Sequence, residues 1–214
     1  MKKQIITYCL IALCCCVYRG LGQKIVGDCT ITFKVSARED STHAKNSIKN
    51  AYKKFYVRGG LSLTEISFNN YLQSTIYNKN GNNIYVMYQI GNQKYLSVLS
   101  EKDWAKQFDK YKGAQLQTLD DTLNILGYTC QKVMAVLTDG TKINLYYTPE
   151  LKTNVSENPY QFDNVNGLIL KYEADIDNKY KITYTATSID FNPVPAAKFI
   201  IPKEGYRILD TDNQ

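Results

Sequence analysis

Alternation of apolar and polar residues with a period of two runs through most of this 214-residue chain and limits its fold more than any other feature. Side chains of a β-strand point to opposite faces in turn, so this period is typical of strands with one buried face. The 18 tyrosines also favour strands. The clearest runs span residues 31–35, 84–90, 133–137, 143–147, 168–172 and 180–186.

Short turn sequences separate these runs. Such dipeptides supply the positive φ angles that tight hairpins need, so consecutive strands should pair antiparallel. A further short strand is expected at 199–201. The pattern predicts an antiparallel meander of about nine to eleven strands. The four turn sequences are Gly59-Gly60, Asn80-Gly81, Gly91-Asn92 and Asp139-Gly140.

One helix stands out, from Ser100 to Lys112. Ser100 and Asp103 form an S-x-x-D capping box, and Gly113 is placed to end the helix. Its aromatic residues recur at a helical spacing and form one stripe, which should pack on the sheet. These residues are Trp104, Phe108 and Tyr111.

The first 22 residues have the pattern of a signal peptide. Lys2 and Lys3 precede an apolar run over residues 5–17, and Gly20-Leu21-Gly22 offers small residues for cleavage before Gln23. We therefore expect a single β domain over residues 23–214. An uncleaved membrane anchor is one alternative. Lipidation of Cys14, Cys15 or Cys16 is another, although no small residue of the lipobox type precedes Cys14.

Export sets the expectations for charge and for cysteines. The formal net charge of +6 falls to +3 once Lys2, Lys3 and Arg19 are removed, which is too low to indicate a nucleic-acid partner. Only Cys29 and Cys130 remain in the mature chain. An oxidising compartment favours a disulfide between them, and two separately buried thiols are the alternative.

Residues that could carry chemistry are few. His43 is the only histidine, which excludes a multi-histidine metal site and leaves one residue for Ser-His-Asp chemistry. The acidic pairs Asp120-Asp121 and Asp175-Ile176-Asp177 lie at predicted turns, where aspartate is common. No phosphate-binding loop, G-x-S-x-G or H-E-x-x-H motif is present. We expect no cofactor, no metal and no enzymatic activity.

Basic and aromatic residues also mix between positions 45 and 58. They resemble a patch for single-stranded nucleic acid. An exported protein does not usually meet that partner, so we interpret them as the exposed face of a second, weaker helix over 41–50 that runs into an edge strand. The residues are Lys45, Lys49, Tyr52, Lys53, Lys54, Phe55, Tyr56 and Arg58.

Several motifs in the second half resemble a family of exported bacterial domains named after its GLPGLI sequence. The stretch 125–132 (ILGYTCQK), the segment 146–151 (YYTPEL) and the element 164–173 carry the resemblance, with Asn166 in place of the motif's proline. The C-terminal pattern from Tyr184 to Tyr206 also matches. The resemblance implies a fold related to the outer-membrane lipoprotein carriers: a strongly curved, unclosed antiparallel half-barrel with one or two helices on its concave face. It implies no catalytic residues.

These expectations converge on a mainly β, non-enzymatic protein of the periplasm or outer membrane. A half-barrel with an apolar interior can accept an acyl chain, so we expect a hydrophobic ligand, either a lipid or a lipidated protein. The helix carrying Trp104, Phe108 and Tyr111 would act as a lid over this ligand. The alternative is an envelope structural or protein-interaction module with a filled core, in peripheral contact with the membrane or with another envelope protein.

Overall fold

The structure, a computed structural model, describes residues 22–37, 48, 50–157, 160–162, 164–176 and 180–209. It contains fourteen strands and one short α-helix in these ranges. The elements are β1 (Lys24–Val26), β2 (Asp28–Ala37), β3 (Tyr52–Arg58), β4 (Leu61–Phe68), β5 (Tyr71–Asn78), β6 (Asn83–Ile90), β7 (Gln93–Ser100), α3 (Glu101–Lys106), the 3₁₀ turn η1 (Asp109–Tyr111), β8 (Gln115–Ile125), β9 (Tyr128–Val136), β10 (Lys142–Thr148), β11 (Leu151–Thr153), β12 (Leu168–Ile176), β13 (Tyr180–Asp190), η2 (Ala196–Phe199) and β14 (Arg207–Leu209).

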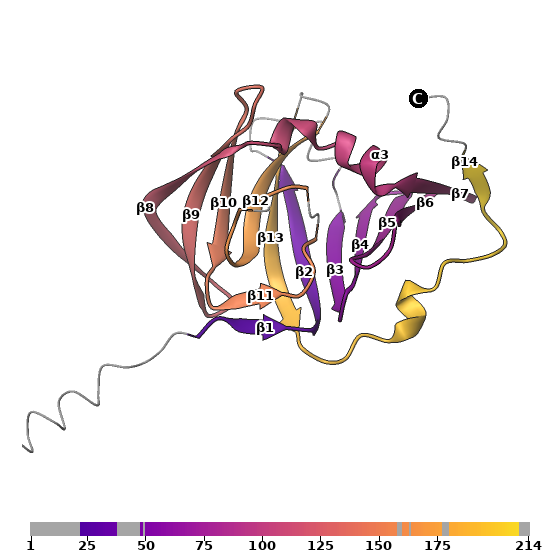
Figure 1. Cartoon of the computed structure of the whole chain (residues 1–214), viewed down its shortest axis with the longest axis horizontal. Coiled ribbons are helices and arrows are strands. Elements are labelled where there is room, and N and C mark those ends of the chain that lie inside the picture. The colour runs from indigo at the N-terminus through magenta and orange to yellow at the C-terminus, as the bar shows by residue number, and fades with distance from the viewer. Residues whose placement is uncertain are drawn as a thin grey trace, which may run out of the picture.

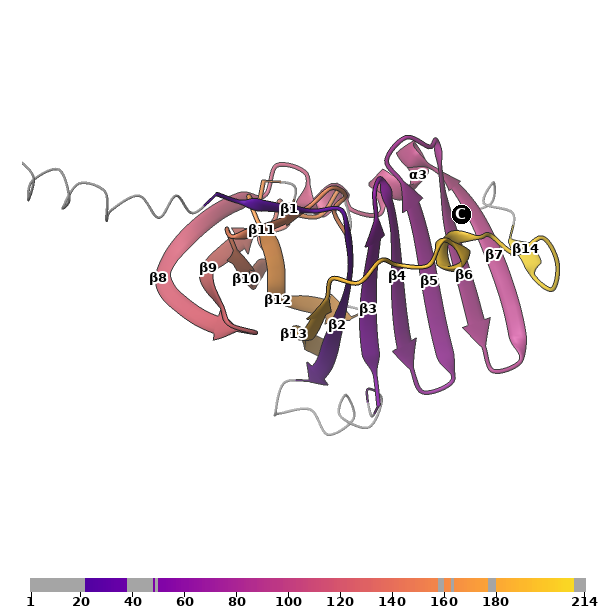
Figure 2. The ribbon, with the colours of Figure 1, turned by 90° about the horizontal axis from the view of Figure 1, so that it is seen from below.

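Twelve strands form one open sheet in the order β14-β7-β6-β5-β4-β3-β2-β13-β12-β10-β9-β8 (Figure 1). The sheet is antiparallel apart from the short pair β14–β7. Figure 2 shows that β8, β9, β10, β12, β13 and β2 curl into an arc, whereas β3 to β7 form a flatter row. The predicted mainly β, curved and unclosed sheet is therefore confirmed.

The predicted turn sequences also lie where expected. Gly59, Gly91 and Gly140 adopt positive φ angles of 56°, 59° and 82° between consecutive strands. Two long strands were not predicted. β8 is largely exposed and carries an irregularity between Thr118 and Thr122, so it lacks the alternation of a half-buried strand. In β5, polar residues interrupt both faces of the strand, so the alternation is weak. Residue 199 ends η2 instead of starting a strand, which corrects the expected strand at 199–201.

The concave face of the arc holds the main core. Ile31 and Phe33 of β2 and Leu170 of β12 are at most 1% exposed. β1 and β11 pair parallel to each other and cross the open side of the arc (Figure 1). The concave face is thus covered from one side by a short ribbon of two strands.

The helix is shorter than predicted. Ser100 caps α3 as expected, because the Asp103 amide donates to Ser100 Oγ at 3.1 Å. The regular helix ends at Lys106, and a separate 3₁₀ turn follows before Gly113, whose φ is 80°. Trp104 is 8% exposed and packs with Ile84, Val86 and Leu99. By strand register Val86 lies on the same face of the sheet as Phe55, so Trp104 packs on that face.

The opposite face of the flat row has its own cover. The chain after β13 runs across β3 to β6 before it reaches β14 (Figure 2). Val194 and Phe199 of this C-terminal strap, residues 191–206, are buried against Tyr56, Leu63, Ile76, Met87 and Leu96. The flat row is therefore a middle layer with apolar residues on both faces.

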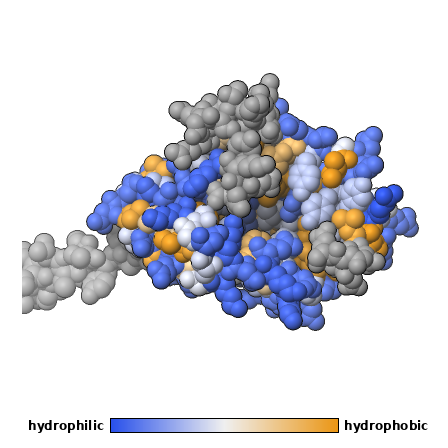
Figure 3. Space-filling view, turned by 90° about the horizontal axis from the view of Figure 1, so that it is seen from above, coloured by the Kyte–Doolittle hydropathy of each residue, from blue (hydrophilic) through white to orange (hydrophobic). Residues whose placement is uncertain are grey.

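The outer surface is mainly polar. Figure 3 shows hydrophilic residues over most of the face seen from above, with apolar residues in smaller groups between them. The three large apolar residues that are most exposed lie on separate segments: Ile25 on β1, Ile200 directly after η2 and Ile208 on β14. Isolated exposed residues of this kind are common on folded proteins and do not by themselves indicate a binding surface.

Two of the sequence predictions fall mostly outside the described residues. The predicted signal peptide falls on residues 1–22, of which only residue 22 is described, and His43 lies outside the described residues. Of the second helix predicted over 41–50, only residues 48 and 50 are described, and both lie in a turn. Among the described residues, no helix has the length and apolar character needed to cross a bilayer.

Candidate functional site

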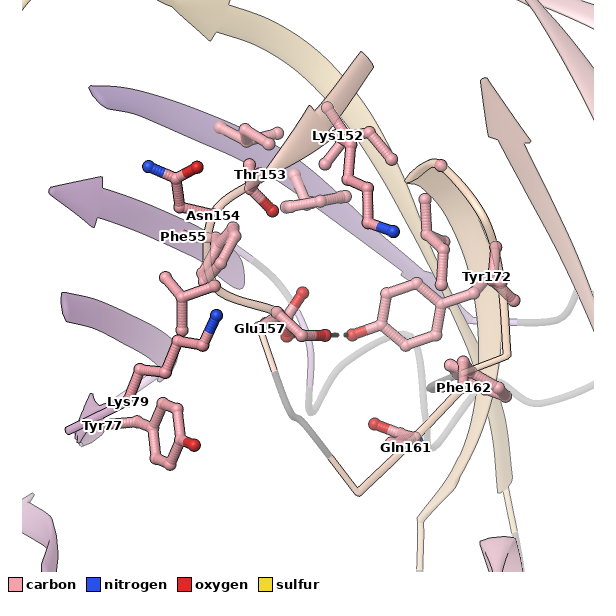
Figure 4. A pocket seen from close by; sticks show the side chains of 18 residues that line it. Phe55, Tyr77, Lys79, Lys152, Thr153, Asn154, Glu157, Gln161, Phe162 and Tyr172 are labelled. Carbon is pink, nitrogen blue, oxygen red and sulfur yellow. Dashed lines mark hydrogen bonds between the residues drawn. The ribbon is translucent and has the colours of Figure 1, made fainter. Parts of the chain in front are cut away.

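A cavity of about 290 Å³ opens between the arc and the segment that follows β11. Its floor is apolar and comes from β2, β3 and β12, where Phe33, Phe55 and Tyr172 line it. Polar residues line its other side: Lys79, Lys152, Asn154, Glu157 and Gln161. Figure 4 shows the ammonium groups of Lys79 and Lys152 directed toward the space around Glu157. The cavity therefore joins an apolar base to a polar, cationic mouth.

Strand pairing places a lysine beneath this floor. Lys53 of β3 lies directly opposite Phe33 of β2, and Tyr172 of β12 lies opposite Tyr184 of β13. Lys53 shares its strand face with Phe55 and Val57, since alternate residues of a strand point the same way. Its side chain therefore enters the core, where it is 1% exposed.

Three aromatic rings surround the ammonium group of Lys53. Its Nζ lies 4.7 Å from the centroids of Tyr172 and Tyr184 and 5.4 Å from that of Phe33. These are cation–π distances. Lys53 also donates to the hydroxyl oxygen of Tyr172 and forms an ion pair with Glu157. A buried lysine thus has aromatic, hydrogen-bonding and ionic partners at once.

Burial and pairing act on the lysine in opposite directions. Loss of solvation lowers the pKa of Lys53 well below its ordinary value. A nearby carboxylate favours the ammonium form, and Glu157 is the carboxylate that contacts it. The charge on Lys53 therefore depends on an anion at this position. Burial also raises the pKa of Tyr172 well above its usual range, so this phenol stays protonated and can donate.

Glu157, the third member of this cluster, lies in a less regular part of the chain. It lies in the irregular segment between β11 and β12, and its side chain is 27% exposed. The Tyr172 hydroxyl donates to Glu157 Oε1 at 3.5 Å, as the dashed line in Figure 4 shows. One carboxylate thus bridges the buried lysine, the tyrosine and the cavity.

A second cavity of about 420 Å³ lies beside the first, under η1. Phe108 and Tyr111 line it, and Phe162 borders both cavities. Ring contacts run continuously between them: Tyr111 to Phe162 at 5.5 Å and Phe162 to Tyr172 at 6.2 Å between centroids. Phe162 therefore lies between the two cavities and contacts aromatic rings on both sides.

The three residues proposed for the lid stay in contact in the structure. The ring centroids of Trp104 and Phe108 lie 5.4 Å apart, and those of Phe108 and Tyr111 lie 6.2 Å apart. Phe108 and Tyr111 are half-buried and line the second cavity, whereas Trp104 is buried against β6 and β7. Binding by these residues stays a prediction.

The predicted disulfide is not formed in the structure. Cys29 and Cys130 are both free, buried thiols. They lie on β2 and β9, with β13, β12 and β10 between these strands in the sheet. Both belong to the same apolar cluster, so burial and not bonding accounts for them. The alternative of two buried thiols is the one that the structure has.

The interpretation of Lys53 as part of an exposed basic face is wrong. β3 is an internal strand between β2 and β4, and Lys53 points inward. The signal was present in the sequence: Lys53, Phe55 and Val57 stand at i, i+2 and i+4. The exposed pair Asp120-Asp121 makes no catalytic dyad, since Asp121 contacts Lys132 at 3.0 Å. Within the described ranges, no cluster of three His, Cys, Asp or Glu could hold a metal.

Comparison with known proteins identifies the family of this chain. The family model for the N-terminal domain of N-glycanase peptide, PNGase F-II, matches residues 60–205. The chain belongs to this family. The match is to an N-terminal domain and not to a whole N-glycanase. No curated protein sequence matches significantly. The resemblance to GLPGLI domains and lipoprotein carriers has no counterpart in these comparisons and stays a prediction.

Solved structures show similarity of a distant kind. A structure of PNGF-II in the C2 space group has a TM-score of 0.48 and 15% identity, over 87% of this chain and 31% of that chain. An uncharacterized conserved protein from Thermus thermophilus has a TM-score of 0.48 and 11% identity, over 84% of this chain and 89% of that one. The chain thus spans about a third of the PNGF-II chain.

Proposed function

We propose that this N-glycanase N-terminal family member is an exported, non-enzymatic binding domain that holds a hydrophobic or lipidated ligand in its half-barrel, as the resemblance to lipoprotein carriers implies. The observation that carries the proposal is the cavity between Phe33, Phe55 and Tyr172 and the segment after β11. Its volume of about 290 Å³ is close to the lower end of small-molecule sites, ~300 Å³. Apolar walls with a few converging polar groups are typical of such sites.

The lining supports binding over hydrolysis. Among the described residues, Glu157 is the only carboxylate that lines this cavity, and it is already paired with Lys53. Acid–base hydrolysis of the glycosidase type uses two carboxylates on opposite sides of the substrate. The family description also names an N-terminal domain, which fits a module with a role other than bond cleavage.

The test is a titration of the protein with a fluorescent fatty acid, followed by the emission of the probe. We expect saturable binding that Val165→Trp weakens, because Val165 lines the cavity and a larger side chain there fills it. Ile200→Trp adds a similar bulk at a site that is 68% exposed and outside the lining, so it should leave binding unchanged. Native mass spectrometry of protein purified from its own envelope should show a co-purifying lipid.

A negative result would favour the alternative function. Absence of binding across fatty acids, fatty alcohols and acylated peptides would overturn the proposal. The domain would then be an envelope structural or protein-interaction module.

A further inference from the structure

We propose that Glu157 is an internal stand-in for the carboxylate of the ligand, so that the cavity takes an amphiphile whose carboxylate replaces Glu157 on Lys53 and Tyr172. This inference rests on the proposed function and adds the chemical class of the ligand.

The first support is that the two partners of the ion pair are held unequally. Lys53 lies on β3, which is hydrogen-bonded on both sides, and its side chain is 2% exposed. Glu157 lies in an irregular segment, and its side chain is 27% exposed. Displacement therefore costs little on the glutamate side, since its carboxylate can turn into water. The cation stays in place.

The second support is that the pocket around Glu157 is already a carboxylate site. Lys53 provides an ammonium group, and Tyr172 provides a hydroxyl that donates to Glu157 Oε1 at 3.5 Å. Both are donors suited to a carboxylate, and hydrogen bonds to a charged acceptor are about twice as strong as neutral ones. A ligand carboxylate at the same point would use the same donors.

The third support is the charge at the mouth. Lys79 and Lys152 line the cavity along with Glu157, so its lining carries two cations against one carboxylate that Lys53 neutralises. Lys152 Nζ donates to Asn166 Oδ1 at 3.2 Å, at the same rim. Such a lining attracts an anionic head group. The apolar base for the chain of the amphiphile is provided by Ile31, Phe33, Phe55 and Leu168.

The experiment compares decanoate with decanol, which share an alkyl chain and differ in charge, by isothermal titration calorimetry at pH 7. For the unaltered protein we expect decanoate to bind more tightly than decanol. Glu157→Gln should raise decanoate affinity by about tenfold, because no internal carboxylate competes, and should leave decanol affinity unchanged. Lys53→Met should reduce the preference for decanoate to the part that Lys79 and Lys152 provide at the mouth.

Proton exchange gives a readout that a structural role of Lys53 would not move. In Glu157→Gln, burial disfavours the charged lysine, so a bound decanoate should draw a proton onto Lys53. Calorimetry in two buffers of different ionisation enthalpy should show proton uptake in this variant and none in the unaltered protein.

Two variants serve as controls. Lys54→Met removes the neighbouring lysine, whose side chain points to the other face of β3, and should keep the decanoate preference. If Lys53→Met does not fold because Glu157 is left unpaired, the double variant Lys53→Met/Glu157→Gln removes both charges and should show the same reduced preference for decanoate.

The outcomes separate the two proposals. Equal binding of decanoate and decanol by the unaltered protein and by Glu157→Gln, an undiminished preference in Lys53→Met, or a loss of decanoate affinity in Glu157→Gln would overturn the stand-in role alone. Absence of binding of either amphiphile to any of these proteins would overturn the binding function itself.

Discussion

Lys53 is buried because of its position on an internal strand, in spite of its charge. Its neighbours Tyr52 and Lys54 point to the opposite face, so strand alternation commits it to the core side with Phe55. Taking an ammonium group out of water costs several kcal/mol unless it is paired. Three aromatic rings, the Tyr172 hydroxyl and Glu157 offset that cost. A charge held in this way is typical of a site with a function beyond packing.

The two cysteines should titrate as protected thiols. Burial raises the pKa of Cys29 to about 12 and that of Cys130 to about 11. Thiolate is the reactive form, so both should react slowly with Ellman's reagent at pH 8 in the folded protein that begins at Gln23. Both should react rapidly after unfolding in guanidinium chloride without reductant. Finding no thiol in the unfolded protein would mean that the bridge forms.

The same pKa shifts affect stability at high pH. The folded state holds both thiols protonated, whereas the unfolded thiols ionise near their ordinary value of 9.0. The stabilisation is therefore complete below pH 9 and is lost as the pH rises toward the folded values. The free energy of unfolding, measured with urea, should fall between pH 9 and 11 in the protein and fall less in the double variant Cys29→Ala/Cys130→Ala.

At the scale of elements, a close approach between β10 and the start of β12 shapes one wall of the cavity. Gly167 comes directly before β12, where a Cβ atom would lie 2.3 Å from the Thr148 carbonyl oxygen and 2.5 Å from Tyr147 Cδ2. Only glycine fits so near to backbone. This explains a glycine in the element 164–173 that the family resemblance singled out.

Gly167→Ala should lower the free energy of unfolding by about 1–3 kcal/mol, because the strands must separate to admit a methyl group. Gly60→Ala is the matched control. Its nearest heavy atom would be Lys79 Cβ at 3.8 Å, and it does not have a positive φ angle, so its effect should be neutral or slightly stabilising. Urea unfolding of both variants tests the difference. Equal stability of the two would contradict the close approach.

α3 depends on packing more than on its length. A helix of 6 residues gains little from its own hydrogen bonds, so Trp104 and the Ser100 cap must hold it. Trp104→Ala should cost about 3–5 kcal/mol, since it empties a site among Ile84, Val86 and Leu99. Phe191→Ala, at a residue that is 41% exposed, should cost far less. Thermal unfolding of both variants checks this, and a small loss in Trp104→Ala would place α3 outside the core.

At the scale of the whole molecule, the sheet has cover on both faces. The strap 191–206 is tied down by Arg58, which donates to the Val194 carbonyl, and by the Val194 amide, which donates to Asp28 Oδ1 at 3.2 Å. Lys198 Nζ lies 3.4 Å from a carboxylate oxygen of Glu65. The flat row would otherwise expose an apolar face that includes Tyr56, and large exposed patches favour association.

Phe199→Ala should therefore destabilise the flat row more than the arc. We expect a loss of about 3 kcal/mol in unfolding free energy and faster amide hydrogen exchange in β4 to β6 than in β9 to β12. Ile200→Ala changes a side chain that is 68% exposed and should alter neither. Uniform acceleration across both halves would show that the sheet unfolds as one unit.

The sequence by itself determined the class of fold and most of its elements. Period-two alternation and paired turn residues are local properties, and they were sufficient for the antiparallel pairs β3–β4 and β6–β7 and for the Ser100 cap. They could not indicate β8, because an exposed edge strand has no buried face to produce alternation.

Only the tertiary structure decided the candidate site. Lys53 meets Tyr172 and Glu157, which lie more than a hundred residues away along the chain, because β2 and β13 bring β3 and β12 to the same concave face. The alternation in β3 indicates that Lys53 points to the same side as Phe55. The groups that stabilise its buried charge come from other strands and from the irregular segment that carries Glu157, where the sequence has no periodic pattern. The two free thiols have the same origin: strand order, not spacing in the sequence, sets which residues meet.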